Sequence, residues 1–312
     1  MANKEMRVVL AEGLASLMRA DKRIIVIDAD LGRANGTLAL RKEFPERAFD
    51  VGIAEQNMAS VAAGMAAGGA TVFINSFTPF VTRRICDQIA VSISYAKRNV
   101  KIIGTDPGLA AELNGATHMS VEDIGVLRSI PDIVIFEVTD EVQLAAALPV
   151  ITAYNGPVYI RLFRKLIDRV FDPDTYQFDL KGVDLVKAGK DVTIFASGLM
   201  VQESVKAIAP LKEEGISVEL INVHTIKPID VEAVVASARK TNAVVTCENH
   251  NIIGGLGSAV AETLAKNYPT PMEMIGIQDR FGQVGYLPFL KEEYSMDIKS
   301  IIAAVKKVAL RK

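Results

Sequence analysis

A glutamate that opens an alanine-rich helix is the first residue in this sequence with a clear chemical use. Glu55 stands in the segment FDVGIAEQNMASVAAGMAAGG (Phe49–Gly69), directly after a short apolar run. An acid in the first turn of a helix also interacts favourably with the helix dipole, so its position alone does not establish a function. The small residues of this helix allow very close packing, which can hold the carboxylate at an interface where a ligand and a partner chain meet.

Two phenylalanines and a histidine follow the next predicted strands. Phe77 and Phe80 lie in NSFTPFVTRRICDQI (Asn75–Ile89), and loops that follow strands usually carry the sites of α/β proteins. From these residues alone, two aromatic side chains of the core are the favoured interpretation. The next segment, IIGTDPGLAAELNGATHMSVEDIG (Ile102–Gly125), is predicted to be a long loop, and loops of this length are usually functional or disordered. Its polar, glycine-rich composition favours a site role for His118.

Two further segments carry weaker signals. Arg161 and Arg164 end a predicted strand, where they could face solvent or bind a phosphate or carboxylate through charge-assisted hydrogen bonds. The segment CENHNIIGGLGSAVAE (Cys247–Glu262) places a glycine-rich turn between a strand and a helix. It lacks the spacing and the downstream acid of a dinucleotide-binding loop, so a tight turn for packing is favoured.

These residues must be positioned by two series of buried strands separated by helices. Short apolar runs predict strands at 23–30, 71–76, 99–106, 132–138, 158–163, 191–197, 217–223, 243–249 and 272–277. Helices are expected at Glu55–Ala67, Arg83–Ser94, Asp140–Leu148 (stopped by Pro149) and Gln202–Glu214. This alternation predicts two doubly wound α/β domains with mostly parallel sheets, at 1–166 and 191–312. Residues 167–190 are expected to form a linker with some extended structure.

Composition excludes several classes of protein. The chain of 312 residues is 50% hydrophobic and 23% charged, and its net charge of −2 gives no bulk attraction to nucleic acid or anionic membranes. No apolar run reaches the roughly 18 residues that a membrane span needs, and the start does not resemble a signal peptide. Cys86 and Cys247 are too few for a disulfide framework. A cytoplasmic location is expected.

The motifs taken together strongly resemble the transketolase family. In chain order they are DADLGRANG, GIAEQNM, FTPFVTRRICDQI, NGATHMSVEDIG, RSIP, YIRLFR, TIKPID, ENHNIIGGLGSAVAE and DRFGQVG. The resemblance covers essentially the whole chain and is specific as a set, although each motif alone is not. It implies a pyrimidine-binding domain of a thiamine-diphosphate enzyme, followed by a transketolase C-terminal domain.

The resemblance assigns roles to the residues singled out above. Glu55 matches the acid that hydrogen-bonds the cofactor's aminopyrimidine and favours its imino tautomer, whose nitrogen removes the thiazolium C2 proton. The resulting carbanion attacks a ketose carbonyl, and the cofactor then serves as electron sink. Phe77 and Phe80 match the aromatic cleft that stacks on the pyrimidine. Further cofactor-binding positions are Arg83, Gln88 and Asp30.

Other positions of the resemblance concern the substrate. His118 matches a residue that lines the reacting centre, and Arg164, with Arg161 nearby, matches an arginine that holds the substrate phosphate. Two positions depart from the family pattern: Asp106 replaces a histidine that contacts the sugar phosphate, and Asn114 replaces an acid that contacts substrate hydroxyls. Both changes leave the cofactor chemistry intact and put the usual pentose-phosphate donor in doubt. We expect Asp106 to pair with one of the arginines and to lower its affinity for phosphate; the alternative is that Asp106 points away and leaves ordinary sugar-phosphate binding.

One family motif is missing. Transketolases hold the diphosphate and Mg²⁺ on a separate domain with a GDG motif, and no GDG occurs in this sequence. The chain starts where the pyrimidine domain starts, so it resembles a natural half, and none of its residues is expected to bind metal. We therefore expect a partner subunit with the GDG motif, an α2β2 heterotetramer and sugar-phosphate substrates. The alternatives are the beta subunit of a 2-oxo-acid dehydrogenase, a deoxyxylulose-phosphate-synthase-like enzyme and a non-catalytic regulatory subunit.

Overall fold

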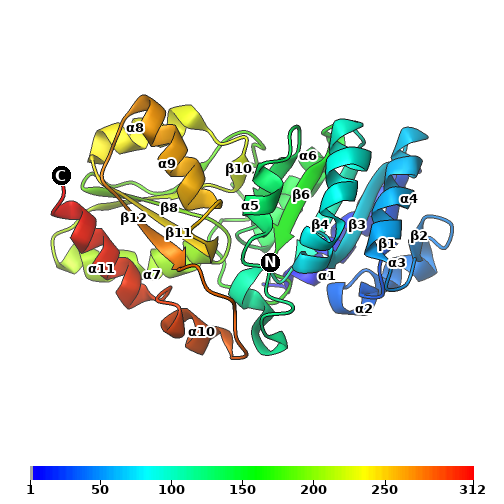
Figure 1. Cartoon of the computed structure of the whole chain (residues 1–312), viewed down its shortest axis with the longest axis horizontal. Coiled ribbons are helices and arrows are strands. Elements are labelled where there is room, and N and C mark those ends of the chain that lie inside the picture. Colours follow the sequence, from blue (N-terminus) through cyan, green and yellow to red (C-terminus); the bar gives the residue numbers. More distant parts are fainter. Residues whose placement is uncertain (1–2) are drawn as a thin grey trace. The chain divides into compact units, whose positions relative to one another are not determined.

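The computed structural model describes residues 3–312, which form two compact units (Figure 1). The first unit comprises the chain up to Pro107 together with Val126–Leu180. The second comprises Gly108–Gly125 and Lys181–Lys312. The segment of the predicted loop that carries His118 therefore belongs to the second unit by its contacts.

The first unit is built on a parallel sheet. Six of its strands follow the order β5-β6-β4-β3-β1-β2, and each neighbouring pair is parallel. Their bounds are β1 (Ile24–Asp28), β2 (Ala48–Asp50), β3 (Thr71–Phe77), β4 (Val100–Thr105), β5 (Val134–Glu137) and β6 (Val158–Leu162). All residues of β4 and β6 are buried, because helices cover both faces of the sheet, as expected for parallel strands of this composition.

Helices α1 (Met6–Ala20) and α6 (Glu141–Ala153) pack against each other, whereas α4 (Glu55–Ala67) packs against β3 and a π-helical segment at Gln88–Tyr95. Buried alanines of α4, among them Ala59 and Ala62, allow this close approach. The remaining short helices are α2 (Gly32–Asn35), α3 (Leu38–Glu43), α5 (Asp123–Arg128) and the 3₁₀ turns Thr78–Phe80, Arg83–Ile85 and Gly108–Asn114.

The second unit contains a smaller sheet with the order β12-β11-β8-β9-β7, in which only β7 is antiparallel to its neighbour. Helices α8 and α9 cover one face, and α7 and α11 cover the other (Figure 1). The strands are β7 (Asp184–Lys187), β8 (Val192–Ala196), β9 (Val218–Asn222), β10 (Thr225–Lys227), β11 (Val244–Asn251) and β12 (Met272–Ile277). The helices are α7 (Met200–Glu213), α8 (Val231–Thr241), α9 (Leu256–Asn267), α10 (Leu287–Glu293) and α11 (Ile298–Ala309).

The structure confirms the predicted fold class, the nine predicted strands and the helix at Glu55–Ala67. The prediction that Pro149 stops its helix was wrong, because α6 continues to Ala153. Pro149 and Ala145 both lie on the exposed side of α6, so water can satisfy the Ala145 carbonyl that the proline leaves without its helical donor. The range predicted as a linker contains β7, an edge strand of the second sheet.

The glycine-rich turn before α9 serves packing, as favoured from the sequence. The Glu248 carboxylate accepts hydrogen bonds from the backbone N–H groups of Leu256 (2.6 Å) and Gly257 (2.8 Å). A side chain at Gly255 would collide with this carboxylate, since a Cβ there would lie 1.9 Å from a Glu248 oxygen. The anion at the start of α9 is therefore a residue of the chain itself.

A buried lysine makes the stability of the first unit depend on pH. Lys101 is fully buried in β4, and its ammonium donates to the carbonyls of Tyr154 (2.6 Å) and Gly156 (2.8 Å). Burial lowers the pKa of Lys101 from 10.5 to about 7. Between these two values the unfolded chain binds more protons than the folded chain, so the free energy of unfolding rises with pH across that window.

We predict that the free energy of unfolding of the wild type rises between pH 7 and pH 9 by about 2 kcal/mol more than that of Lys101→Met. The measurement is denaturant unfolding of both proteins at the two pH values. Lys22→Met, which removes an exposed lysine, is the matched control and should keep the wild-type pH dependence. An unchanged slope in Lys101→Met would contradict the prediction.

Candidate active site

The candidate site lies at the carboxyl edge of the first sheet. From β1 the chain passes to β2 on one side and then to β3 on the other, so the strand order reverses between β1 and β3. Open α/β sheets bind ligands at such a switch point. The register places Asp28 beside Asn75, and it places Phe77 beside Thr105, which in turn pairs with Leu162. The residues that follow these strands therefore gather at one edge.

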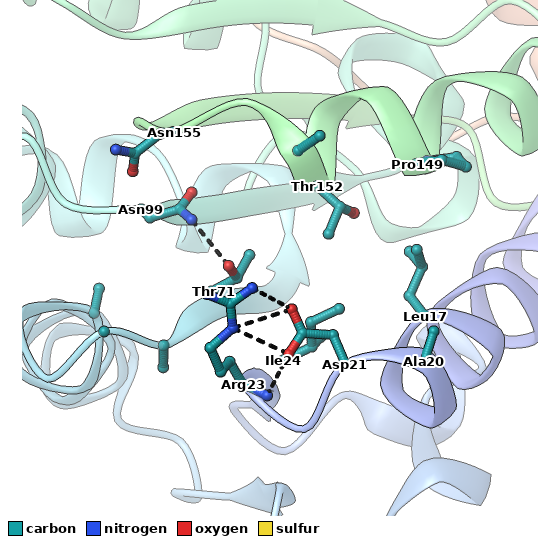
Figure 2. A pocket seen from close by; sticks show the side chains of 14 residues that line it. Leu17, Ala20, Asp21, Arg23, Ile24, Thr71, Asn99, Pro149, Thr152 and Asn155 are labelled. Atoms are coloured by element: carbon teal, nitrogen blue, oxygen red, sulfur yellow. Dashed lines mark hydrogen bonds and ion pairs between the residues drawn. The ribbon is translucent and has the colours of Figure 1, made fainter.

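A cavity at the opposite edge is a poor candidate. Its volume is about 550 Å³, and Ile24, Thr71 and Asn99 line it at the amino ends of their strands (Figure 2). Its polar groups pair with each other: Arg23 binds Asp21 at 2.8 Å, and Asn99 donates to the Thr71 hydroxyl at 2.9 Å. Because ligands of such sheets bind at the carboxyl ends, we do not assign the function to this cavity.

Glu55 is the first residue of α4 and is only 4% exposed. The guanidinium of Arg84 donates to its Oε1 at 2.7 Å. A buried carboxylate needs such a partner, because the cost of removing its charge from water is otherwise not offset. The structure thus holds an acid at the edge of the sheet with an arginine as its ion-pair partner.

The two phenylalanines lie together beside this acid's partner. Phe77 and Phe80 are half-buried, and their ring centroids are 6.2 Å apart with an interplanar angle of 37°. The guanidinium carbon of Arg84 lies 4.0 Å from the Phe80 centroid, and that of Arg164 lies 4.8 Å from the Phe77 centroid. Cations over both rings make this a polar, partly accessible aromatic surface, which differs from a pair of core side chains.

Asp106 and Arg164 form an ion pair, which confirms the expectation that Asp106 pairs with an arginine. The Arg164 side chain donates to Asp106 Oδ2, its backbone N–H donates to Oδ1 (3.2 Å), and its guanidinium also donates to the Ala34 carbonyl (3.1 Å). Burial raises the pKa of Asp106, and the charge of Arg164 opposes this shift. Asp106 also adopts a left-handed backbone conformation, with φ of +49°, which is uncommon outside glycine.

Arg161 lies inside β6, one residue before the end of the strand, whereas Arg164 lies beyond it. It is fully buried within β6, and its guanidinium donates to the buried Glu137 carboxylate on β5. The difference follows from position along the strand. A side chain inside the strand points to one of the two faces of the sheet, which helices cover, whereas a residue beyond the strand end is no longer part of the sheet. The charge of Arg161 is thus paired with an acid of the same sheet, and its substrate role stays a prediction.

The acid at the end of β1 that is buried at this edge is Asp28, which sequence reasoning did not single out. Asp28 is buried and accepts hydrogen bonds from Thr37 (2.8 Å) and Asn75 (3.2 Å). Burial raises the pKa of Asp28, although Thr37, Arg41 and Asn75 oppose the shift. An acid inside the apolar run IIVID was the available signal.

The predicted Asp30 is instead exposed, with φ of +64°, and its backbone N–H donates to Asp50 at 3.0 Å. Partial burial favours a higher pKa of Asp50. Hydrogen bonds from the N–H groups of Asp30 and Gly52 and the charge of Arg41 outweigh this effect, so the pKa of Asp50 is lowered. The backbone of Asp30 is therefore fixed, whereas its side chain faces outward.

A second missed residue is Arg84, next to the predicted Arg83. Both are exposed residues of the 3₁₀ turn Arg83–Ile85, but it is Arg84 that contacts Glu55 and Phe80. The sequence TRR gives no means of choosing between neighbours, because a 3₁₀ turn rotates successive side chains by about 120°. Gln88 begins the π-helical segment that packs on α4 and is half-buried.

His118 and Asn114 lie on the segment that belongs to the second unit. His118 is half-buried, and its Nδ1 lies 2.9 Å from the Thr117 hydroxyl. The Asn114 amide donates to the Ala111 carbonyl at 2.9 Å. The start of the segment is held by the buried Asn249, whose side-chain oxygen accepts from the Leu109 N–H at 2.9 Å. The site roles of both residues stay predictions.

Family models identify both units. The model of the transketolase pyrimidine-binding domain matches residues 2–169, and that of the transketolase C-terminal domain matches residues 181–301. The chain belongs to the transketolase family.

Relatives agree with this membership. The 6-deoxy-6-sulfo-D-fructose transketolase subunit SqwH of Clostridium sp. (strain MSTE9) is 48% identical, with 96% of this chain and 92% of the relative covered. A putative transketolase C-terminal section of Methanocaldococcus jannaschii is 40% identical, with 96% and 94% covered. The 1-deoxy-D-xylulose-5-phosphate synthase 1 of Geobacter sulfurreducens is 32% identical, and the match spans 47% of that longer protein.

A solved structure described as "Split gene transketolase, inactive beta4 tetramer" superposes with a TM-score of 0.91 at 40% identity. The match covers 98% of this chain and 99% of that one.

Membership of the transketolase family implies thiamine diphosphate as cofactor, and the carboxyl edge suits its aminopyrimidine. Glu55 offers a buried acceptor, and Phe80 offers an aromatic face that is already covered by a planar nitrogen-rich group, the Arg84 guanidinium. Among residues 3–312, no group of three or more His, Cys, Asp or Glu side chains is arranged to hold a metal ion. Within the same residues, no helix is long and apolar enough to span a bilayer.

We predict that Phe77→Ala and Phe80→Ala mainly weaken binding of thiamine diphosphate by this transketolase-family chain together with its partner, because each removes an aromatic face. The expected rise in Kd is about 2- to 13-fold, from the typical worth of an aromatic contact. Cofactor titrations of the assembled protein measure it, with Phe281→Ala, an exposed ring of the second unit, as control. A loss confined to kcat at saturating cofactor would contradict a stacking role.

Proposed function

We propose that this chain is the C-terminal subunit of a split transketolase, which transfers a two-carbon ketol unit from an anionic ketose donor to a sugar-phosphate acceptor. The observation that carries the proposal is the buried Glu55 at the carboxyl edge of the sheet, beside Phe77 and Phe80. A partner subunit with a GDG motif supplies the diphosphate site and Mg²⁺, since the sequence has no GDG. The active assembly is an α2β2 heterotetramer.

In this proposal thiamine diphosphate supplies the nucleophilic carbon and the electron sink. Glu55 fixes a proton at the ring nitrogen of the pyrimidine, a task for which its burial strengthens the hydrogen bond. Phe77 and Phe80 fix the plane of the ring. His118 assists proton transfer at the reacting centre, and Arg164 attracts the terminal anion of the substrate.

The dependence on a partner has independent support from the relatives. The SqwH relative is named as a subunit, and the Methanocaldococcus relative is named as a C-terminal section of about this length. The superposed split-gene transketolase is described as an inactive β4 tetramer. A chain of this kind can thus associate with itself without being active, and by analogy we propose that this chain is inactive alone.

The alternative functions that the sequence suggests have less support. The synthase relatives are 31–32% identical and about twice as long as the matched region, whereas the SqwH and Methanocaldococcus relatives match nearly end to end at 48% and 40% identity. A beta subunit of a 2-oxo-acid dehydrogenase would share the fold and the need for a partner. A neighbouring gene for a GDG-bearing chain, rather than for a lipoyl-binding protein, separates the two.

Asp106 beside Arg164 favours a donor whose anionic group carries less negative charge than a phosphate dianion. Arg164 is already paired with Asp106, so a phosphate must approach a cation whose charge is offset by an adjacent acid. A sulfonate carries a single charge and meets less repulsion. The SqwH relative acts on a 6-deoxy-6-sulfo sugar by its name, and we propose a donor of that class for this chain.

The first test of the function is reconstitution. The isolated chain should show no turnover, and addition of the GDG-bearing partner should produce turnover that depends on thiamine diphosphate. Glu55→Gln should assemble normally yet lose about 10²–10⁴-fold in kcat, because a neutral amide cannot drive the tautomer change. Glu262→Gln, an acid on α9 of the second unit, is the matched control. Near-normal kcat in Glu55→Gln would show that the assignment is wrong.

The second test concerns the donor. Asp106→His removes the acid and releases Arg164, so kcat/KM for xylulose 5-phosphate should rise at least about tenfold, or roughly 1.4 kcal/mol. Asp106→Asn, which removes the charge without adding a cation, should give a smaller rise. Steady-state kinetics with xylulose 5-phosphate and 6-deoxy-6-sulfofructose decide it. Efficient use of xylulose 5-phosphate by the wild type, unchanged in both variants, would refute a role for Asp106 in donor choice.

A further inference from the structure

One side chain of this protein satisfies both groups that the proposed function assigns to the aminopyrimidine. Arg84 donates to Glu55 Oε1 at 2.7 Å, and its guanidinium carbon lies 4.0 Å from the centre of the Phe80 ring. The two contacts come from one planar group, so the guanidinium covers a face of Phe80 while an edge N–H points to the carboxylate.

A guanidinium and an aminopyrimidine share the features that these contacts recognise. Both are flat and delocalised, and both present N–H donors in their plane while their faces stack on aromatic rings. The Glu55 carboxylate and the Phe80 ring cannot serve two such groups in the same place. A pyrimidine that stacks on this face of Phe80 and bonds to Glu55 must therefore displace the Arg84 guanidinium.

We propose that Arg84 occupies the aminopyrimidine subsite of the cofactor-free chain and swings into solvent when the cofactor binds. The inference rests on the proposed function, since it takes thiamine diphosphate as the ligand of Glu55. Arg84 then has two effects. It keeps the buried Glu55 paired while the subunit lacks cofactor, and it weakens cofactor binding by the free energy of the contacts that must be broken.

The surroundings of Arg84 suit a side chain that leaves. Its side chain is 42% exposed, whereas that of Glu55 is 5% exposed, so the freed guanidinium can be hydrated where it stands. Its backbone is held independently, because the Gln56 amide donates to the Arg84 carbonyl at 3.4 Å. The other arginine on the aromatic pair differs: Arg164 is 15% exposed and is held by both Asp106 and Ala34. Arg84 is therefore better placed to move than Arg164.

The test measures binding of thiamine diphosphate with Mg²⁺ to the complete complex, by titration calorimetry. Arg84→Ala should lower Kd about 3- to 30-fold, because a partly buried ion pair and a cation–π contact no longer compete with the cofactor. Arg84→Lys retains the charge but cannot stack in the same way, so it should give an intermediate Kd. Arg239→Ala removes an arginine stacked on Tyr268 in the second unit (4.6 Å) and is the matched control.

A second readout follows the side chain itself. In ¹⁵N-arginine-labelled protein, the signal of the Arg84 Nη1–H group that donates to Glu55, identified by its absence in Arg84→Ala, should exchange faster with water once cofactor is added. Equal or weaker cofactor binding by a folded Arg84→Ala complex, or an unchanged Arg84 signal, would overturn the inference and leave the proposed function standing. If the wild-type complex binds no thiamine diphosphate, the proposed function itself fails.

Discussion

The parallel pairing of β1, β3, β4 and β6 is the constraint on which the candidate site depends. Parallel strands finish at a common edge, and the register here aligns Asp28 with Asn75 and Thr105 with Leu162. Residues far apart in the sequence, such as Asp106 and Arg164, therefore become neighbours because each directly follows such a strand end. A slip of one residue in β4 or β6 would separate this pair and send the alternating side chains to the other face.

Acids at this edge are neutralised by cations of the same chain. Asp28 and Asp50 share Arg41, Glu55 pairs with Arg84, and Asp106 pairs with Arg164. Buried carboxylates require partners, and a subunit whose ligands come from elsewhere must still fold before they arrive. Internal ion pairs meet that requirement. A ligand that binds one of these acids must break its ion pair and form new contacts in its place. The affinity for the ligand therefore reflects the difference in free energy between the two sets of contacts.

The sequence predicted the elements well and the choice between neighbouring side chains poorly. The strands and α4 followed from apolar runs and helical period, because burial of a parallel sheet leaves a strong pattern in the sequence. Pro149 was misjudged because a local rule was applied without knowing that the freed carbonyl faces solvent. Arg84 and Asp28 were not singled out because the contacts of Arg84 depend on the rotation of a short turn, and the burial of Asp28 depends on which side of a strand end is covered. Arg161 was predicted to lie at the edge of the sheet. A difference of one or two residues in the length of the strand decides whether a side chain there is buried or accessible.

The second unit shows why a motif of polar residues need not mark chemistry. In ENHN, Glu248 caps α9 and Asn249 accepts from the Leu109 N–H, 140 residues away in the sequence. The Gly125 N–H donates to His250 Nε2 (3.3 Å), and Asn251 donates its N–H to the Val121 carbonyl (2.8 Å). Gly108 is required at the entry, because its φ is +53° and a Cβ would lie 2.4 Å from the Asn249 carbonyl oxygen. The conformation of the segment that carries His118 is therefore set by β11, so substitutions in ENHN should be interpreted first as changes to that segment.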